Sequence, residues 1–280
     1  MRRFLITGGT GFFGQSIRDF VLRNACDCSI AVLSRHQGDI VGDVRTFDVG
    51  TARFDCVIHA ATPVAEVVPE AEMRSIVVEG TANALRQAKK CGAEKFMMVS
   101  SGGVYGRDLV RPVSEIDVPC PVTAYGQAKL EAEAMAVASG LHVLLPRCFA
   151  FVGKRLPREA HFAIGNFIRD ALAGHDIIIN GDGMPMRSYL YADDLVEWLF
   201  AILDRGESGR VYNVGSPEAI SIRGLAVLVR DALGAKSEVK VLGKPVPGAA
   251  NFYVPDVSRI QSELGVEVKH PLAEAIRLSV

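Results

Sequence analysis

The sequence contains no long hydrophobic run. It has no stretch of about 18 uncharged apolar residues, the length at which a membrane-spanning helix becomes a candidate. The apolar start of the chain, residues 4–6, is followed at once by Thr7-Gly8-Gly9, which is too early for the core of a secretory signal. We therefore expect a cytoplasmic protein that has no membrane partner.

The chain also lacks an excess of charge. Its 31 Lys and Arg residues face 32 Asp and Glu residues, which gives a net charge of -1. A protein that binds nucleic acid through a broad basic surface would carry a clear positive excess, so we expect no nucleic-acid partner. Hydrophobic residues make up 49% of the chain, which is enough for a buried core and argues against disorder.

Metal-binding patterns of cysteine and histidine are missing as well. The six cysteines include no Cys-x-x-Cys pair, and Cys26 and Cys28 are too close for a zinc finger. We expect reduced thiols and no metal site. Internal repeats and low-complexity tails are also absent from the sequence.

Short apolar segments alternate with helical patterns through the first 150 residues. We expect strands at 4–6, 30–33, 56–59, 96–99 and 142–145, and helices at 14–23, 73–91 and 124–138. Continuous apolar strands that alternate with helices are typical of a parallel sheet covered on both faces. The pattern predicts an α/β fold with a Rossmann-type doubly wound parallel sheet.

The pattern changes after residue 147. Helices are expected at 164–173, 192–204 and 224–233, and strands at 177–179 and 211–214. We predict a dinucleotide-binding domain at 1–150 that includes a contribution from about 190–215. Residues 151–280 would mainly form a small C-terminal substrate-binding lobe, with the ligand cleft at the carboxyl edge of the sheet.

A glycine-rich segment follows the first expected strand directly. Gly8, Gly11 and Gly14 form G-x-x-G-x-x-G, and Gly9, Gly11 and Gly14 also match G-x-G-x-x-G. Glycine allows a tight turn and close backbone approach, and the following helix directs its positive end at a phosphate. An ordinary glycine-rich loop is the alternative, but the position between strand and helix favours dinucleotide binding. The predicted cofactor-binding residues of this segment are Gly8, Gly11, Phe12, Phe13 and Gly14, of which the three glycines would line the pyrophosphate.

The end of the second expected strand bears on the choice of cofactor. NAD-binding proteins usually place a carboxylate there, against the ribose 2′-hydroxyl. This chain has Ser34 and Arg35, and no carboxylate before Asp39. A guanidinium can bind a 2′-phosphate with two charge-assisted hydrogen bonds, so NADP(H) is favoured, and NAD stays possible. The alternative is that Arg35 is a solvated loop residue.

A tyrosine and a lysine stand four residues apart at an expected helix start. On one helix face, Lys129 and an oxidised nicotinamide would lower the pKa of Tyr125 and let it exchange a proton with a substrate oxygen. Ser101 follows the fourth expected strand and can hydrogen-bond the same oxygen. A surface helix pair and a turn serine are the alternatives when each motif is taken alone.

Together these motifs resemble the extended short-chain dehydrogenase/reductase family. Within it, the chain is similar to the NAD-dependent epimerase/dehydratase branch that acts on nucleotide sugars. The resemblance extends over nearly the whole chain. The matching segments are 7–14, 57–61, 100–106, 125–129, 146–147, 181–183, 187–189 with 193–194, and 212–215.

The resemblance implies an enzyme with three catalytic residues. Tyr125 would be the proton donor or acceptor, Lys129 would hold the nicotinamide ribose, and Ser101 would orient the sugar oxygen. Arg187 matches the arginine that family members direct at the substrate diphosphate. The alternative for this arginine is a surface ion pair with an aspartate at 193–194.

The resemblance also implies further cofactor contacts and an assembly. Asp48 and Val49 stand where the family contacts adenine, and the backbone of Ala60 and Ala61 would pass the cofactor. In the family, the helices that correspond to 73–91 and 124–138 pair two subunits, so a homodimer is expected.

Two departures narrow the expected activity. The sugar 4,6-dehydratases follow their hydroxyl residue with Asp-Glu, whereas this chain has Gly102 and Gly103, which carry no proton-transfer group. The chain also ends at Val280, which suggests a smaller substrate lobe than that of typical 4-epimerases.

These features favour an NADPH-dependent reductase of a nucleotide-linked 4-keto-6-deoxy sugar. In that reaction hydride passes from nicotinamide C4 to the keto carbon and Tyr125 donates the proton. An NAD-dependent nucleotide-sugar 4-epimerase is the alternative, and a non-catalytic dinucleotide-sensing protein is a further one. The sequence does not select the nucleotide base, the sugar or the stereochemistry of the product.

Overall fold

The protein consists of two compact units. The computed structural model describes residues 1–63, 68–107, 109–159, 162–244 and 251–280. Unit 1 comprises Met1–Gly106, Glu115–Cys148 and Trp198–Tyr212, and unit 2 comprises Arg107–Ser114, Phe149–Glu197 and Asn213–Val280. The sequence placed the main boundary at 150 and returned about 190–215 to the first domain. It did not assign the short segment at 107–114 to the second.

Unit 1 is built on a mostly parallel sheet. The central strand β1 (Arg2–Thr7) pairs in parallel with β2 (Cys28–Ser34) and with β4 (Cys56–His59). The order is β12-β7-β5-β4-β1-β2-β3, with β6 paired to β7. The other strands are β3 (Ile40–Val41), β5 (Lys95–Met98), β6 (Ser100–Ser101), β7 (His142–Cys148) and β12 (Val211–Val214). The order reverses between β1 and β4, the position at which doubly wound sheets bind ligands, so the Rossmann-type prediction is confirmed.

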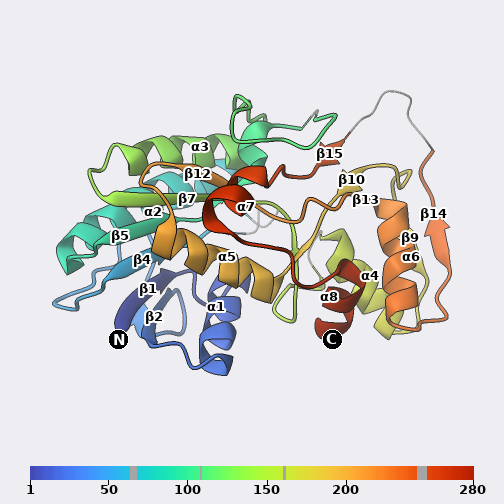
Figure 1. Ribbon diagram of the computed structural model, residues 1–280, viewed down its shortest axis with the longest axis horizontal. Coiled ribbons are helices and arrows are strands. Elements are labelled where there is room, and N and C mark those ends of the chain that lie inside the picture. Colours follow the sequence, from blue (N-terminus) through green and yellow to red (C-terminus); the bar gives the residue numbers. More distant parts are fainter. Residues whose placement is uncertain (64–67, 108, 160–161, 245–250) are drawn as a thin grey trace. The chain divides into compact units, whose positions relative to one another are not determined.

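Helices cover both faces of this sheet. The helical segments are α1 (Phe12–Arg23), α2 (Glu70–Cys91), the 3-10 turn η1 (Gly102–Tyr105), α3 (Ala124–Val137) and the part of α5 (Ala192–Arg205) from Trp198 onward. Side chains alternate along β1, so Leu5 joins one core with α2 and α3, which lie side by side (Figure 1). Phe4 points to the other face and meets Phe200 of α5 at a ring distance of 5.9 Å.

Unit 2 has three small sheets and its own core. Strand β8 (Phe151–Val152) pairs with β11 (Leu190–Tyr191), and β9 (Ile177–Ile179) pairs with β14 (Val239–Val241). The third sheet has the order β13-β10-β15, formed by Ile220–Ser221, Met186–Arg187 and Phe252–Tyr253. Helices α4 (Ala163–Leu172), α6 (Ile222–Ala232) and α8 (Leu272–Leu278) supply the apolar core, and α7 (Ser258–Leu264) precedes α8 in the chain (Figure 1).

The structure also bears on the cysteines, on metal-binding groups and on membrane-spanning helices. All six cysteines are free thiols. Over the described ranges, no group of three or more His, Cys, Asp or Glu side chains is placed to hold a metal ion. The same ranges contain no helix that is both long enough and apolar enough to cross a membrane.

Candidate active site

The glycine segment forms a tight turn at the carboxyl end of β1. Gly8 has a φ of +73°, a conformation that side chains disfavour. A Cβ atom on Gly8 would lie 2.7 Å from the Cα of Ala61 and 2.9 Å from the carbonyl oxygen of Ala60. The turn and the segment after β4 therefore touch through their backbones, and the sequence prediction brought these same residues together.

Helix α1 begins directly after this turn. Gly11 is its N-cap residue, and no side-chain oxygen caps it. A Cβ atom on Gly14 would lie 2.3 Å from the Cα of Gly9, so only glycine lets the helix pack this closely on the turn. The first helical residues, Phe12 and Phe13, place their rings edge to face at 5.7 Å. An uncapped helix start beside a glycine turn fits the pyrophosphate of a dinucleotide.

A buried histidine supports the glycine turn through hydrogen bonds. The Nδ1 atom of His59 lies 2.8 Å from the Thr7 hydroxyl, and its Nε2 atom lies 3.0 Å from the Thr81 hydroxyl. Thr81 donates its own proton to the Val77 carbonyl, so it accepts from Nε2–H, and Thr7 then donates to Nδ1. Thr7 also accepts the backbone N–H of Ala61 at 3.2 Å. Burial lowers the pKa of His59 to about 3, so the ring is neutral. The sequence analysis gave this histidine no role, although its place at the end of a buried strand was visible.

Two arginines gather at the end of β2 and β3. Ser34 is buried and its hydroxyl accepts the backbone N–H of Gln37 at 3.1 Å, so it closes a turn that leaves Arg35 exposed. Asp43 follows β3 and accepts two hydrogen bonds from the Arg45 side chain, at 2.9 and 2.6 Å, and one from the Arg45 backbone N–H at 2.8 Å. The Arg45 hydrogen bonds lower the pKa of the Asp43 carboxyl, and the charge of Arg35 acts in the same direction. The sequence analysis singled out Arg35 and missed Arg45, whose only signal is its spacing from an aspartate.

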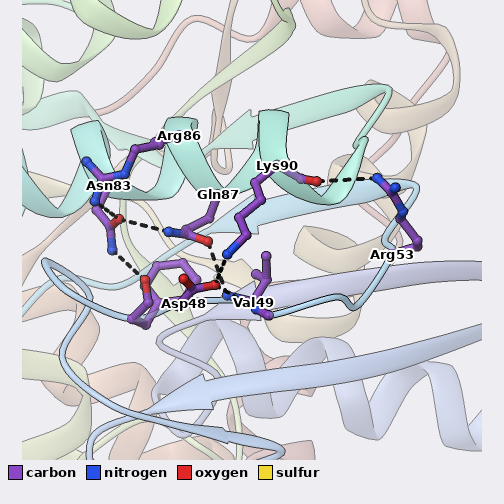
Figure 2. Close-up of polar contacts among 9 residues, drawn as sticks. Asp48, Val49, Arg53, Asn83, Arg86, Gln87 and Lys90 are labelled. Carbon is purple, nitrogen blue, oxygen red and sulfur yellow. Dashed lines mark hydrogen bonds and ion pairs between the residues drawn. The ribbon is translucent and has the colours of Figure 1, made fainter.

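The expected adenine contacts, Asp48 and Val49, bind the far part of α2. The N–H of Val49 donates to Gln87 Oε1 at 3.1 Å, and the Asp48 carboxylate accepts from Lys90 Nζ at 2.5 Å. Figure 2 shows these contacts together with the hydrogen bond from Arg53 to the Lys90 carbonyl. The segment that contains Asp48 and Val49 is therefore fastened along the last turns of the helix.

The expected adenine contact of Asp48 and Val49 stays a prediction, and the segment after β3 is a competing position for it. Ser75, near the start of α2, accepts a hydrogen bond from Arg45 at 3.3 Å and marks the edge of the sheet where the glycine turn lies. Gln87 is twelve residues farther along α2 (87 − 75). At a rise of 1.5 Å per residue this is about 18 Å. Asp48 and Val49 are therefore fastened far along α2 from that edge, whereas the segment after β3 lies at it.

The three expected catalytic residues lie together in unit 1. Tyr125 is in the first turn of α3, which Thr123 caps by accepting the Gly126 N–H at 3.1 Å. Ser101 ends β6 and its hydroxyl accepts the Gly103 N–H at 3.1 Å, and the side chains of Ser101 and Tyr125 both lie against Gly103. Lys129 follows one helical turn after Tyr125.

Burial dominates the acid–base properties of this group. It raises the pKa of Tyr125, against which the hydrogen bond with Ser101 acts. It also lowers the pKa of Lys129 to about 8. The ammonium donates to the Val99 carbonyl at 2.9 Å and to the Thr62 hydroxyl at 2.8 Å, and lies 5.9 Å from the centre of the Tyr125 ring. Burial therefore dominates the pKa of Tyr125 in the protein alone, and its lowering by Lys129 together with an oxidised nicotinamide stays a prediction.

Two glycines, Gly103 and Gly126, bring the backbone close to the expected catalytic residues. A Cβ atom on Gly103 would lie 3.3 Å from Ser101 Oγ and 3.6 Å from Tyr125 Cε1. A Cβ atom on Gly126 would lie 2.6 Å from the Gly103 carbonyl oxygen. The start of α3 therefore rests directly on the backbone of η1, and the Ser101–Tyr125 contact depends on this close approach.

The remaining expected site residue, Arg187, lies in unit 2. Its Nη1 atom donates to the Asn251 side chain at 3.0 Å and to the Met186 carbonyl at 2.8 Å. Its guanidinium carbon is 6.0 Å from the centre of the Tyr253 ring, and burial lowers its pKa. Asp194, one aspartate offered as an ion-pair partner, is hydrogen-bonded instead to His270 Nδ1 at 2.7 Å.

Comparisons with known proteins agree with this arrangement. Residues 4–215 match the model of the NAD dependent epimerase/dehydratase family. UDP-glucuronic acid decarboxylase 6 of Arabidopsis thaliana is 27% identical over 302 residues, which cover 99% of this chain and 87% of that protein. dTDP-glucose 4,6-dehydratase of Streptomyces griseus is 32% identical over 207 residues, which cover 72% of this chain and 62% of that protein. A solved structure of UDP-glucose 4-epimerase from Thermotoga maritima, with UDP-glucose, superposes with a TM-score of 0.88 at 25% identity and covers 99% of this chain and 97% of that one.

Proposed function

Because the chain belongs to the NAD-dependent epimerase/dehydratase family, we propose that it is an NADPH-dependent reductase of a nucleotide-linked 4-keto-6-deoxy sugar. Family membership makes it an NAD(P)-dependent enzyme of the extended short-chain dehydrogenase type. The relatives named above are all enzymes, so nothing favours the non-catalytic sensor that the sequence left open.

The observation that carries the proposal is the placement of Ser101 and Tyr125 side by side against Gly103. Ser101 can hold a sugar oxygen while Tyr125 donates a proton to it. Gly102 and Gly103 supply no second acid or base. A dehydration needs additional proton transfer, whereas a carbonyl reduction needs one proton and one hydride, so the residues suit reduction.

The residues of unit 1 fit a nicotinamide dinucleotide. Gly11, at the uncapped start of α1, would hold the pyrophosphate, and the backbone of Ala60 and Ala61 would line its path. A dinucleotide bound there would supply the hydride. Arg35 supports NADPH over NADH because an exposed guanidinium at the end of β2 can pair with a 2′-phosphate. Lys129 would bind the nicotinamide ribose with the ammonium that now meets Thr62.

The substrate class rests on unit 2 and on the relatives. Arg187 is positioned by Asn251 and Tyr253, and its guanidinium is suited to a diphosphate. The names of the relatives contain UDP-glucuronic acid, dTDP-glucose and UDP-glucose, which supports a nucleotide sugar. Binding energy from the nucleotide would hold the keto carbon in a reactive position. The expected homodimer stays a prediction.

A nucleotide-sugar 4-epimerase is the second candidate. The Thermotoga maritima epimerase supports it, and this chain spans 97% of that structure. The expectation that a short lobe separates this protein from 4-epimerases therefore loses its basis. The same Tyr125 would take a proton from a sugar hydroxyl and return one after the keto sugar turns over.

The first test is a paired titration with NADPH and NADH, after any bound cofactor has been identified. We expect NADPH to bind at least about tenfold more tightly, which is about 1.4 kcal/mol. The variant Arg35→Asp should reverse the preference because it replaces the cation with a carboxylate near the 2′-phosphate. Arg53→Asp, which changes an arginine beside the end of α2, is the matched control and should leave the preference unchanged.

Turnover then separates the two candidates. A reductase consumes one NADPH for each UDP-, dTDP- or GDP-linked 4-keto-6-deoxy hexose, and an epimerase interconverts UDP-glucose and UDP-galactose without net consumption. UDP-glucuronic acid belongs in the same panel because of the decarboxylase likeness. A protein that is purified with NAD and ignores NADPH would exclude the reductase.

A further inference from the structure

A buried ion pair lies beneath the proposed catalytic residues. Arg147 donates to both carboxylate oxygens of Glu133, from Nε at 3.0 Å and from Nη2 at 2.7 Å. Each side chain is only 6% exposed. The Ser100 hydroxyl donates to the same carboxylate, and the Tyr105 ring lies 4.8 Å from the guanidinium carbon. Sequence analysis noted Arg147 only as part of a matching segment and gave Glu133 no role.

This cluster joins the elements that carry the catalytic residues. Ser100 precedes Ser101 in β6 and is in register with Arg147 of β7. Glu133 lies on α3, one turn after Lys129. Helix α3 is therefore attached to β6 and β7 through this pair, while its first turn rests on η1 at Gly126. The two attachments lie on either side of Lys129 along the helix.

Glu133 has two cations within reach of its part of the helix, Arg147 and Lys129, and its carboxylate binds Arg147. A glutamate four residues from a lysine on a helix normally offers that lysine an ion pair. Here the Arg147 fork and the Ser100 hydroxyl engage both carboxylate oxygens, and the Lys129 ammonium meets Thr62 and Val99 instead. An arginine suits this task because its planar guanidinium matches a carboxylate and stays charged.

We propose that Arg147 is a positioning residue for the reaction, because its fork holds Glu133 away from Lys129 and leaves the Lys129 ammonium for the cofactor ribose. This inference rests on the role assigned to Lys129 in the proposed function. Without the arginine, an unpaired buried carboxylate one turn away attracts the ammonium. Lys129 then turns from the side of Thr62 and Tyr125 toward Glu133.

The test measures the titration of Lys129 itself. Its side-chain signal is followed by NMR in protein labelled with ¹³C-lysine and is assigned by its loss in Lys129→Met. The wild-type midpoint should lie near the low value set by burial, about 8. In Arg147→Met we expect a rise of roughly one pKa unit or more, because an unpaired carboxylate stabilises the ammonium. Arg74→Met is the matched control, since it removes an arginine that pairs with Glu131 on the exposed side of α3.

A double variant distinguishes charge capture from simple loss of structure. Glu133→Gln combined with Arg147→Met removes both charges, so the Lys129 midpoint should return most of the way to the wild-type value. A role in packing alone predicts that the double variant is shifted at least as far as the single one. An unchanged midpoint in Arg147→Met, or an equal shift in both variants, would overturn the proposal.

The test also includes a conservative variant and a second titration with the cofactor. Should Arg147→Met fail to fold, Arg147→Lys replaces it; it keeps a cation but loses the fork, and a smaller rise in the same direction is expected. No rise there would also count against the proposal. The titration is run without ligand and again with NADP⁺. A Lys129 shift in a protein that reduces no keto sugar would retain the positioning role and remove the reductase function.

Discussion

The two edges of the unit 1 sheet use polar side chains in different ways. At the carboxyl edge, His59 and Lys129 are buried and each makes defined hydrogen bonds. At the other end of α2, Asp48 and Lys90 form an ion pair in which the side chains are 60% and 44% exposed. Both edges are held by helix side chains that reach to a neighbouring segment, but the Asp48–Lys90 ion pair is open to water, whereas His59 and Lys129 are not.

This difference determines what a substitution can do. A buried polar group that loses its hydrogen-bond partner has neither that partner nor water, so its full desolvation penalty remains. An exposed group is hydrated again when its partner is removed. Chemistry also needs the buried arrangement, because desolvation lowers the pKa of a lysine toward the working pH. We therefore expect large effects near the glycine turn and small effects at the far end of α2.

The largest effect is expected from protonation of His59. Its pKa is about 3 in the folded protein, against an ordinary value of 6.5, so between these values the unfolded chain binds the extra proton. Stability conferred by the neutral ring is therefore present above pH 6.5 and is lost as the pH falls toward 3. From about pH 7 to about pH 5 this residue should remove about 2 kcal/mol of unfolding free energy.

Urea unfolding at the two pH values measures this loss. His59→Gln is less stable at neutral pH, but its stability should depend less on pH because the titrating group is gone. His175→Gln, at an exposed histidine, should keep the wild-type slope. Equal slopes in all three proteins would show that His59 does not stay neutral.

The next prediction compares two glycine-to-alanine substitutions, one beside the expected catalytic residues and one away from them. Gly126→Ala places a Cβ atom 2.6 Å from the Gly103 carbonyl oxygen, so α3 must move away from η1. We expect a loss of about 1–3 kcal/mol in stability, typical of overpacking, together with lower turnover as Tyr125 separates from Ser101. Gly50→Ala, where φ is +60° and no atom lies within 4 Å, should cost about 1 kcal/mol of backbone strain and leave turnover unchanged. Thermal unfolding and steady-state rates check both variants.

The fold was predictable because long elements carry strong patterns. Helices at 73–91 and 124–138 were expected almost at their observed bounds, and the strands at 56–59 and 211–214 match the structure. The two-residue strands, among them β3, were missed because two residues show no periodicity. Their pairing depends on neighbours distant in the chain.

The site was predictable where a motif fixes local geometry. Gly8 and Tyr125 lie where the strand–turn–helix motif and the helix spacing predicted. The attachment of Asp48 to the end of α2 was not predictable because, with β3 unrecognised, no register was available for the segment that follows that strand. The bonds from Asn83 to the carbonyls of Val44 and Phe47, which draw that segment along α2, are contacts that no spacing rule reveals.

The smallest effect is expected when one cation is removed from each of the two edges. Arg45→Ala and Lys90→Ala each remove a cation bound to an aspartate, Asp43 and Asp48 respectively. At the carboxyl edge, the change leaves a carboxylate beside Arg35 and the expected 2′-phosphate, so NADPH should bind up to about tenfold more weakly, with a smaller change for NADH.

At the far end of α2 the same chemical change should leave NADPH affinity as in the wild type. It frees Asp48, so a residue that served the adenine would respond, and one fastened about 18 Å along the helix would not. Fluorescence titration with NADPH measures both variants. A weaker affinity in Lys90→Ala and none in Arg45→Ala would return Asp48 to the cofactor site and reverse the assignment of the two edges. The opposite result would tie cofactor recognition to the end of β3, where a second arginine joins Arg35 in discriminating the phosphorylated dinucleotide.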